Sequence, residues 1–144
     1  MIAIDTNILL RYLLDDDPRQ SKKATNLIQG SQKILISDVV LVETVWTLKG
    51  KKYNQGKDGI IKVITALFEE ANIYFEDGQT VWRALVDFKN AKSVKVGSKH
   101  KSADFPDALI VNKAQYASKN LGETLAGVYT FDVAAQEHPG TKAP

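Results

Sequence analysis

Acidic residues stand where this chain passes between apolar segments and helices. Asp5 and Asp132 each follow a short apolar run, and Asp107 lies near the start of a late helical pattern. Glu43 lies within residues 39–48, a helical segment that is apolar on nearly all sides, so we expect its side chain to be buried. Buried or crowded carboxylates need a partner or a cation between them. The four residues therefore predict a metal centre, provided that the fold gathers them at one edge.

Each acid also has a purely structural explanation. Asp5 can cap the following helix, Asp132 can occupy a turn, and Glu43 can pair with a lysine or arginine. Asp104, three residues before Asp107, can cap the same helix by accepting from the Asp107 N–H, or it can act directly at the site. The metal centre is favoured because all four acids fall at helix starts or strand ends on one expected rim.

The elements that would position these acids alternate along the chain. Strands are expected at residues 2–4, 33–37, 72–76 and 124–131, and helices at 7–17, 21–28, 38–49, 57–71, 80–89 and 104–121, with 94–96 as a loop or a helix extension. This alternation predicts an α/β fold with a parallel sheet covered on both faces. Ligands of such sheets bind beyond the carboxyl ends of the strands, where Asp5 and Asp132 are expected.

The types of possible ligand decide which metal we expect. The chain has no cysteine, which excludes a disulfide framework, a thiolate zinc site and a cysteine nucleophile. His100 and His138 lie in polar segments without a spaced partner, so we do not expect either to be a ligand. A set of carboxylates favours Mg²⁺ or Mn²⁺. One or two such ions can activate water for attack on a phosphodiester.

Length and composition limit the class of protein. The 144 residues fit one domain, and a content of 44% hydrophobic and 25% charged residues is typical of a globular protein. The N-terminus has no basic segment before its apolar run, and no apolar stretch reaches about 18 residues. We therefore expect neither secretion nor membrane insertion, and a cytoplasmic location.

The chain carries four motifs that together resemble the PIN-domain ribonucleases, and most closely the VapC-type toxins of toxin–antitoxin pairs: MIAIDTNILLR, SDVVLVETVWTL, ADFPDALI and VYTFD. The likeness extends from Met1 to about Asp132 and implies a single PIN-like domain over residues 1–144. It implies a three-layer α/β/α fold around a mainly parallel sheet of four or five strands. It also implies Mg²⁺-dependent cleavage of RNA, with Mn²⁺ as a substitute, a homodimer, and an antitoxin protein that occludes the site.

The resemblance also assigns roles to residues. The implied catalytic acids are Asp5, Glu43, Asp107 and Asp132, and the implied metal ligands are these four together with Asp104. The implied supporting residues, which orient the first and last acids, are Thr6, Asn7 and Thr130. The chain departs from the family pattern at Pro106, where a small residue is common, and in the segment after Asp132, which lacks a basic residue often found there.

Basic residues offer contacts for RNA phosphates. The run between Phe88 and Asp104 has no acid, and the substrate-binding candidates there are Lys95, Lys99 and Lys101, with a solvated loop as the alternative. Arg11, about two turns after Asp5, is a further candidate, although an ordinary arginine on the helix surface is the favoured explanation. The stretch at 49–57, with Tyr53 available for base stacking, is better explained as surface. The chain has 17 acidic and 19 basic residues, which gives a net charge of +2. Without the five site acids, 12 acidic residues remain beside the 19 Lys and Arg, so we expect the surface outside the site to be basic.

Two other functions are left open. An aspartate-nucleophile phosphatase also places an Asp after its first strand, but its general acid would have to be Asn7, which cannot donate that proton usefully. The second is a PIN-fold module that binds RNA or protein without cutting it. The presence of all four acids argues against such a module, because a cluster of like charges is costly to keep.

Overall fold

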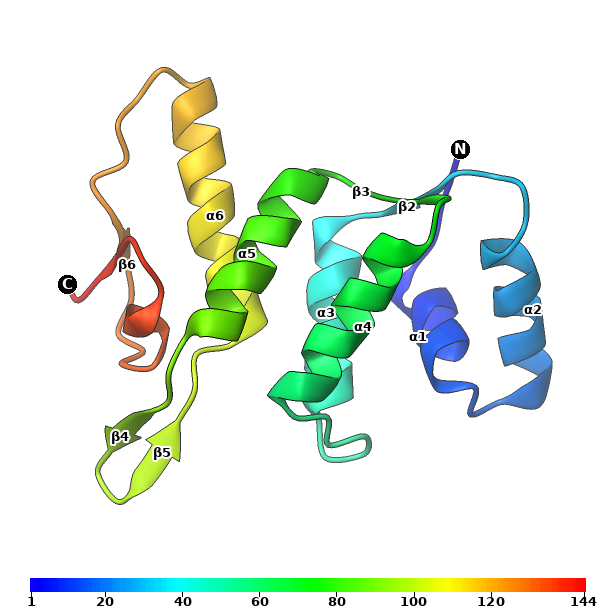
Figure 1. The fold of residues 1–144 in the computed structure, drawn as a ribbon, viewed down its shortest axis with the longest axis horizontal. Coiled ribbons are helices and arrows are strands. Elements are labelled where there is room, and N and C mark those ends of the chain that lie inside the picture. The colour runs from blue at the N-terminus through cyan, green and yellow to red at the C-terminus, as the bar shows by residue number, and fades with distance from the viewer. The chain divides into compact units, whose positions relative to one another are not determined.

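The computed structural model describes all 144 residues and divides into two compact units, Met1–Glu76 and Asp77–Pro144. The first unit contains three strands and the helices α1 to α4, and the second contains the long helices α5 and α6 with several short strands (Figure 1).

A parallel sheet organises the first unit. Three strands pair in chain order, with the second in the middle: β1 (Ile2–Ala3), β2 (Ile34–Ile36) and β3 (Ile73–Phe75). Short apolar runs of this kind are typical of strands in parallel sheets. Because the strands are parallel, their carboxyl ends lie at one edge of the sheet, and the chain enters α1 and α3 from that edge.

Four helices complete the first unit: α1 (Thr6–Leu14), α2 (Pro18–Ile28), α3 (Asp38–Lys49) and α4 (Lys57–Glu69). Asp5, Asp17 and Ser37 cap the first three, because their side-chain oxygens accept N–H bonds from the first turn. In Figure 1, α3 and α4 lie side by side. Aliphatic side chains from the helices and strands form the core, among them Leu9, Ile28, Ile34, Ile36, Leu41, Leu48, Ile60, Ile64 and Leu67.

Two packed helices organise the second unit, α5 (Gly78–Asn90) and α6 (Phe105–Asn120). The rings of Phe88 and Phe105 meet edge to face with their centres 6.1 Å apart. Asn112 Nδ2 also donates a hydrogen bond of 2.8 Å to Asp87 Oδ2, so a polar contact adds to the apolar packing between the helices.

Short strands complete the second unit. Between its two helices the lysine-rich segment forms an antiparallel hairpin of β4 (Val94–Val96) and β5 (Lys99–Lys101), with Gly97 at a positive φ of 63° in the turn. After α6, β6 (Val128–Tyr129) pairs in parallel with β7 (Thr141–Lys142), and the 3-10 turn η1 (Ala135–Glu137) lies between them. The end of the chain is therefore tied to the segment that carries Asp132.

The structure confirms the α/β class, the six helices and the mainly parallel sheet, and it corrects three details. The sheet of the first unit has three strands instead of four or five, because β6 pairs with β7 in a separate sheet. Residues 94–96 form a strand, because they find partners across the hairpin. A strand was expected over residues 124–131, but only Val128–Tyr129 forms one, since only this part pairs with the chain terminus. No helix combines the length and apolar character needed to cross a membrane.

Candidate active site

Asp5 lies at the N-terminus of α1 and is exposed. Its Oδ1 accepts a hydrogen bond of 2.9 Å from the Ile8 N–H, so the expected capping role is confirmed. The positive end of the helix dipole favours a carboxylate at this position. The cap occupies Oδ1 and leaves Oδ2 available as an oxygen ligand.

Thr6 connects the start of α1 to Glu43 of α3. Its hydroxyl Oγ1 donates a hydrogen bond of 2.6 Å to Glu43 Oε2. Hydrogen bonds to an ionised carboxylate are short and comparatively strong. Because Thr6 directly follows Asp5, this bond holds the Glu43 carboxylate beside the first turn of α1, and the first unit thereby brings two of the predicted acids into one group.

Glu43 is exposed, and the expectation of burial is wrong. α3 buries one side through residues such as Leu41 and Val45, whereas Val39 and Trp46 are 66% and 60% exposed. Val39, Glu43 and Trp46 are spaced by four and three residues and so share the opposite face. A helix with apolar residues on nearly all sides did not reveal which side faces the core.

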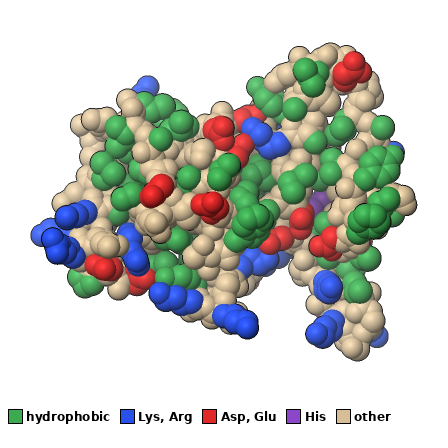
Figure 2. All heavy atoms as spheres, turned by 180° about the vertical axis from the view of Figure 1, so that it is seen from behind, with side chains coloured by type: hydrophobic (Ala, Val, Ile, Leu, Met, Phe, Trp, Pro, Cys, Tyr) green, Lys and Arg blue, Asp and Glu red, His purple; other side chains and the backbone are tan.

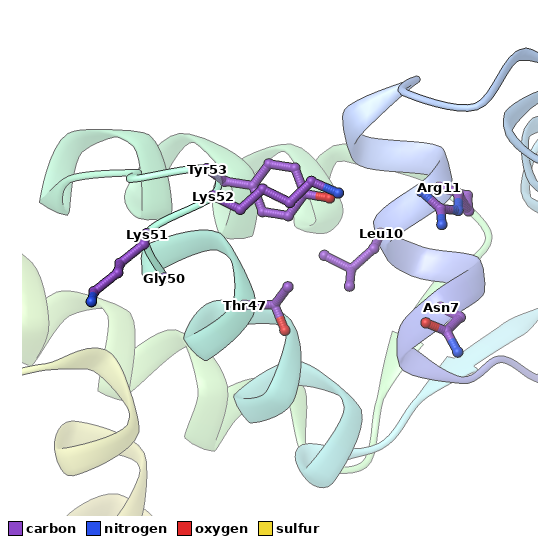
Figure 3. Close-up of a pocket in the computed structure, with 8 residues that line it drawn as sticks. All are labelled: Asn7, Leu10, Arg11, Thr47, Gly50, Lys51, Lys52 and Tyr53. Carbon is purple, nitrogen blue, oxygen red and sulfur yellow. The ribbon is translucent and has the colours of Figure 1, made fainter.

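Asn7 and Arg11 line a cavity of about 360 Å³ in the first unit (Figure 3). Arg11 Nη1 forms an ion pair of 2.6 Å with Asp16, and its Nε donates to Gln20 at 2.7 Å. The hydrogen bond with Asp16 raises the pKa of Arg11. Sequence reasoning missed Asp16, because this contact depends on the turn after α1, where Asp15 has a positive φ of 48°, and no helical spacing signals it.

Asp104 and Asp107 form a capping box at the start of α6. Asp104 Oδ1 accepts the Phe105 N–H at 2.7 Å, and Asp107 Oδ2 accepts the Asp104 N–H at 3.1 Å. Pro106 follows at a position where the helix requires no N–H donor. The structure confirms the expected capping role of Asp104, and its direct role at the site stays a prediction.

Asp107 is half-buried and lies near other acids. Burial raises the pKa of its carboxyl above the ordinary value, and the charges of Asp104 and Asp132 raise it further, whereas the hydrogen bond from the Asp104 N–H lowers it. Asp107 also shares a cavity of about 120 Å³ with Thr130. The second unit therefore places Asp104 and Asp132 within electrostatic range of Asp107.

Asp132 is held by the turn that follows β6. Its Oδ1 accepts N–H bonds from Ala134 and Ala135 at 2.9 Å and 3.3 Å, which confirms the turn role. The Asp132 N–H donates to Thr130 Oγ1 at 3.0 Å. Thr130 thus contacts the backbone of the acid that it was expected to support.

His138 is buried, with 1% of its surface exposed, although it belongs to a polar segment of the sequence. Its Nε2 lies 3.1 Å from the carbonyl oxygen of Asp104, and its Nδ1 has no hydrogen-bond partner. The tail after Asp132 therefore packs back against the start of α6. Sequence periodicity could not show this, because the contact depends on the short pairing between β6 and β7.

The basic candidates of the second unit lie on the β4–β5 hairpin. Lys95, Lys99 and Lys101 are all exposed. Figure 2 shows basic side chains on this hairpin, at the lower right, and in this segment all of them are lysines. The hairpin therefore offers positive charge to a polyanion.

The predicted site residues fall into two groups. Asp5, Thr6, Asn7 and Glu43 belong to the first unit, and Asp104, Asp107, Thr130 and Asp132 belong to the second. In neither unit does a group of three or more His, Asp or Glu side chains lie close enough together to hold a metal ion. The donor chemistry nevertheless fits Mg²⁺ or Mn²⁺, because every predicted ligand is a carboxylate and these ions prefer hard oxygen ligands.

The sequence profile of the PIN domain matches residues 2–126, so the chain belongs to the PIN domain family. The matched range includes all the predicted site residues of both groups except Thr130 and Asp132. PIN domains are typically nucleases, which are hydrolases, and they generally use divalent metal ions. No curated protein sequence matches the chain.

Proposed function

We propose that this chain is an endoribonuclease that requires Mg²⁺ or Mn²⁺ and acts as the VapC-type toxin of a type II toxin–antitoxin pair. The observation that carries this proposal is the hydrogen bond from Thr6 to Glu43, in a chain whose family is typically nucleolytic. Fixing an exposed glutamate costs side-chain entropy. A carboxylate held at Thr6, the residue that directly follows Asp5, therefore suits a metal ligand better than a solvated surface residue.

The chain's own residues divide the work. The residues proposed to hold the metal are Asp5, Glu43, Asp107 and Asp132, with Asp104 as a further ligand. When bound, the cation would supply activation of a water molecule and stabilisation of the leaving oxygen of the phosphodiester. Thr6 orients the Glu43 carboxylate, and Thr130 holds the backbone of Asp132. We expect residues of both groups to be needed for cleavage.

The RNA backbone would be bound by the lysines of the hairpin. Lys95, Lys99 and Lys101 present exposed positive charges on one projecting element. Each phosphate contact on single-stranded RNA steepens the decline of log affinity with log salt by about 0.7. A strong salt dependence of RNA binding is therefore part of this proposal.

The proposed partners are a second copy of the chain and an antitoxin protein, and the proposed location is the cytoplasm. Support for these comes from the resemblance of the four motifs to VapC-type toxins. Induced expression of the wild type and of Asp5→Asn in bacteria tests the toxin role. Growth arrest with new RNA 5′ ends in the wild type alone is expected, and equal growth of both strains would contradict it.

Cleavage in vitro tests the enzyme itself. The purified protein is incubated with structured RNAs and Mg²⁺ or Mn²⁺, and with EDTA as the control. We expect defined new 5′ ends only when the metal is present. A preparation that cuts none of the RNAs with either ion, or that cuts equally well in EDTA, would contradict the proposal.

A module that binds without cutting is the second candidate function. One observation favours it, because Asp5, Asp104 and Asp132 all have capping or turn roles that explain their presence without chemistry. Calorimetric titration with Mn²⁺ separates the two. Binding at millimolar concentration or below supports the nuclease, and no binding in that range supports the inert module.

A further inference from the structure

The cavity lined by Asn7 and Arg11 in the first unit contains none of the acids that we propose to hold the metal. Its volume is about 360 Å³, and it is lined by Asn7, Leu10 and Arg11 from α1, by Thr47 from α3, and by residues 50–53 of the loop that follows (Figure 3). All of these residues lie within one compact unit. The cavity is therefore formed without any contribution from the second unit.

Two residues that line the cavity lie close in sequence to the two acids of this unit. Asn7 lies two residues after Asp5 on α1. Thr47 lies one turn after Glu43 on α3, and its hydroxyl donates a hydrogen bond of 2.8 Å to the Glu43 carbonyl oxygen. One helical turn rises about 5.4 Å. On α3, the cavity residue Thr47 therefore lies about one turn, roughly 5.4 Å along the axis, from Glu43.

Tyr53 gives the cavity an aromatic ring in a fixed orientation. Its hydroxyl donates a hydrogen bond of 3.1 Å to Asp16 Oδ2, and Asp16 also pairs with Arg11. Lys52 Nζ lies 5.2 Å from the centre of the ring. In Figure 3, the Lys52 side chain extends along the Tyr53 ring toward α1. Since Lys52 lies over one face of the ring, a base stacked on the opposite face would have its adjoining phosphate near this cation.

Hydrogen bonds fix the loop that carries these two residues. The Asn54 N–H donates to the Gly50 carbonyl and the Gln55 N–H donates to the Leu48 carbonyl, both at 2.8 Å. Asn54 adopts a positive φ of 47°, which an asparagine tolerates better than most residues. A loop held in this way loses little further freedom on binding, which favours affinity.

The charge of the cavity favours a polyanion. Arg11 is neutralised by Asp16, whereas Lys51 and Lys52 form no ion pair. The two lysines without an ion-pair partner can bind a phosphate, and the ring of Tyr53 can stack on a flat base. An acidic peptide would satisfy the lysines but has no flat base to stack on Tyr53. Single-stranded RNA therefore fits the lining better.

We infer that this cavity is a nucleotide subsite, which holds one base of single-stranded RNA on Tyr53 and the adjoining phosphate at Lys52. The inference rests on the proposed ribonuclease function, because it places the subsite next to the acids at which that RNA would be cut.

Binding without metal tests the subsite separately from cleavage. The probe is a fluorescein-labelled single-stranded oligouridylate of eight nucleotides, and its affinity is measured by anisotropy in EDTA at several salt concentrations. We expect Tyr53→Ala to weaken binding about tenfold or more, as stacked bases generally require. Tyr53→Phe keeps the ring and should bind nearly as the wild type does. Lys52→Ala should reduce the salt slope by about 0.7.

Lys23→Ala serves as the matched control, because Lys23 is an exposed lysine on α2 of the same unit and does not line the cavity. Equal affinity of the wild type, Tyr53→Ala and Lys52→Ala would overturn the inference. So would an equal loss in Lys23→Ala and Lys52→Ala, or a wild type that binds an acidic helical peptide and no RNA. Thermal melting checks the fold, and if Tyr53→Ala is unfolded, Lys52→Ala decides.

Cleavage by the same variants with Mn²⁺ separates this inference from the proposed function. Cleavage by the wild type with unchanged binding by the variants would refute the subsite alone. Weaker binding by the variants with no cleavage by the wild type would refute the nuclease and leave an RNA-binding site.

Discussion

The hydroxyl of Thr6 donates a 2.6 Å hydrogen bond to the carboxylate of Glu43, which lies 37 positions later in the chain. This contact joins the N-terminus of α1 to the exposed face of α3. It makes Thr6 a positioning residue for Glu43, in addition to its place next to Asp5. A specific hydrogen bond therefore ties Glu43 to the residue that directly follows Asp5.

Removal of the Thr6 hydroxyl should reduce cleavage. Thr6→Val keeps the shape and removes the donor, and we expect the cleavage rate to fall about tenfold, because a hydrogen bond to a charged group contributes about 1.5–3 kcal/mol. The Mn²⁺ concentration for half-maximal rate should rise as well. Thr6→Ser restores the hydroxyl and should recover most of the activity. Wild-type rates and Mn²⁺ dependence in Thr6→Val would contradict this role.

The capping box of α6 should contribute to the free energy of unfolding. Asp104→Ala removes the cap, and we expect the free energy of unfolding to fall by about 1 kcal/mol. Asp104→Asn keeps a good capping residue and should change it little. Urea denaturation measures both, with Asn120→Ala at the other end of α6 as a control. Equal stability of the Ala and Asn variants would show that the box contributes nothing.

The cap of α5 should make stability depend on pH. Burial of Asp77 raises its pKa, but hydrogen bonds from the Thr80 hydroxyl and N–H and the charge of Lys113 outweigh this, so the pKa is lower than the ordinary value. A carboxyl with a lowered folded-state pKa contributes stability that is present above its unfolded pKa and lost as the pH falls through the folded pKa. The stabilisation by Asp77 should therefore decline as the pH falls below about 4.

Asp77→Asn provides the comparison, because it still caps the helix but does not titrate. We expect the wild type to be more stable than this variant at pH 7 and to lose that advantage in urea denaturation at the lowest pH at which the protein is folded. An advantage that stays constant with pH would contradict the assignment.

Burial of His138 should make it important for the second unit. Its Nε2 contacts the Asp104 carbonyl oxygen, and its ring is almost fully enclosed. We expect His138→Ala to lower the free energy of unfolding by about 2 kcal/mol, within the usual range for buried substitutions. His100→Ala, at an exposed position on β5, is the matched control and should change it by less than about 0.5 kcal/mol. Similar effects of the two variants would argue against the observed packing of the tail.

Local signals predicted the helices well and the strands less well. α3 begins and ends where expected, because Ser37 caps it and Gly50 follows it. α2 begins at Pro18 instead of Ser21, because Asp17 caps it and proline suits the first turn. The β4–β5 hairpin could not be predicted from its composition, since a run of Lys and His becomes a strand here only through pairing across Gly97.

The site was predictable to the extent that it depends on local spacing. The capping roles of Asp5 and Asp104 and the turn role of Asp132 follow from neighbouring residues and are confirmed. The contact between Thr6 and Glu43 depends on how two helices pack, which no local pattern records. The same holds for Arg11, whose partner Asp16 lies beyond the end of its helix. The assembly of the five acids around a metal stays a prediction.

The most direct measurement of the central claim is the rate of RNA cleavage by Asp5→Asn with Mn²⁺. Asparagine preserves the N-cap of α1, so the fold should be kept while one carboxylate is lost. Loss of a residue that only supports a metal ligand typically lowers activity about 10–100-fold. We predict a larger fall in the cleavage rate for Asp5→Asn, because Asp5 is proposed to be a ligand itself. Asp15→Asn, at an exposed acid outside both groups, should cut at the wild-type rate. Cleavage by Asp5→Asn at the wild-type rate would contradict the assignment of this site.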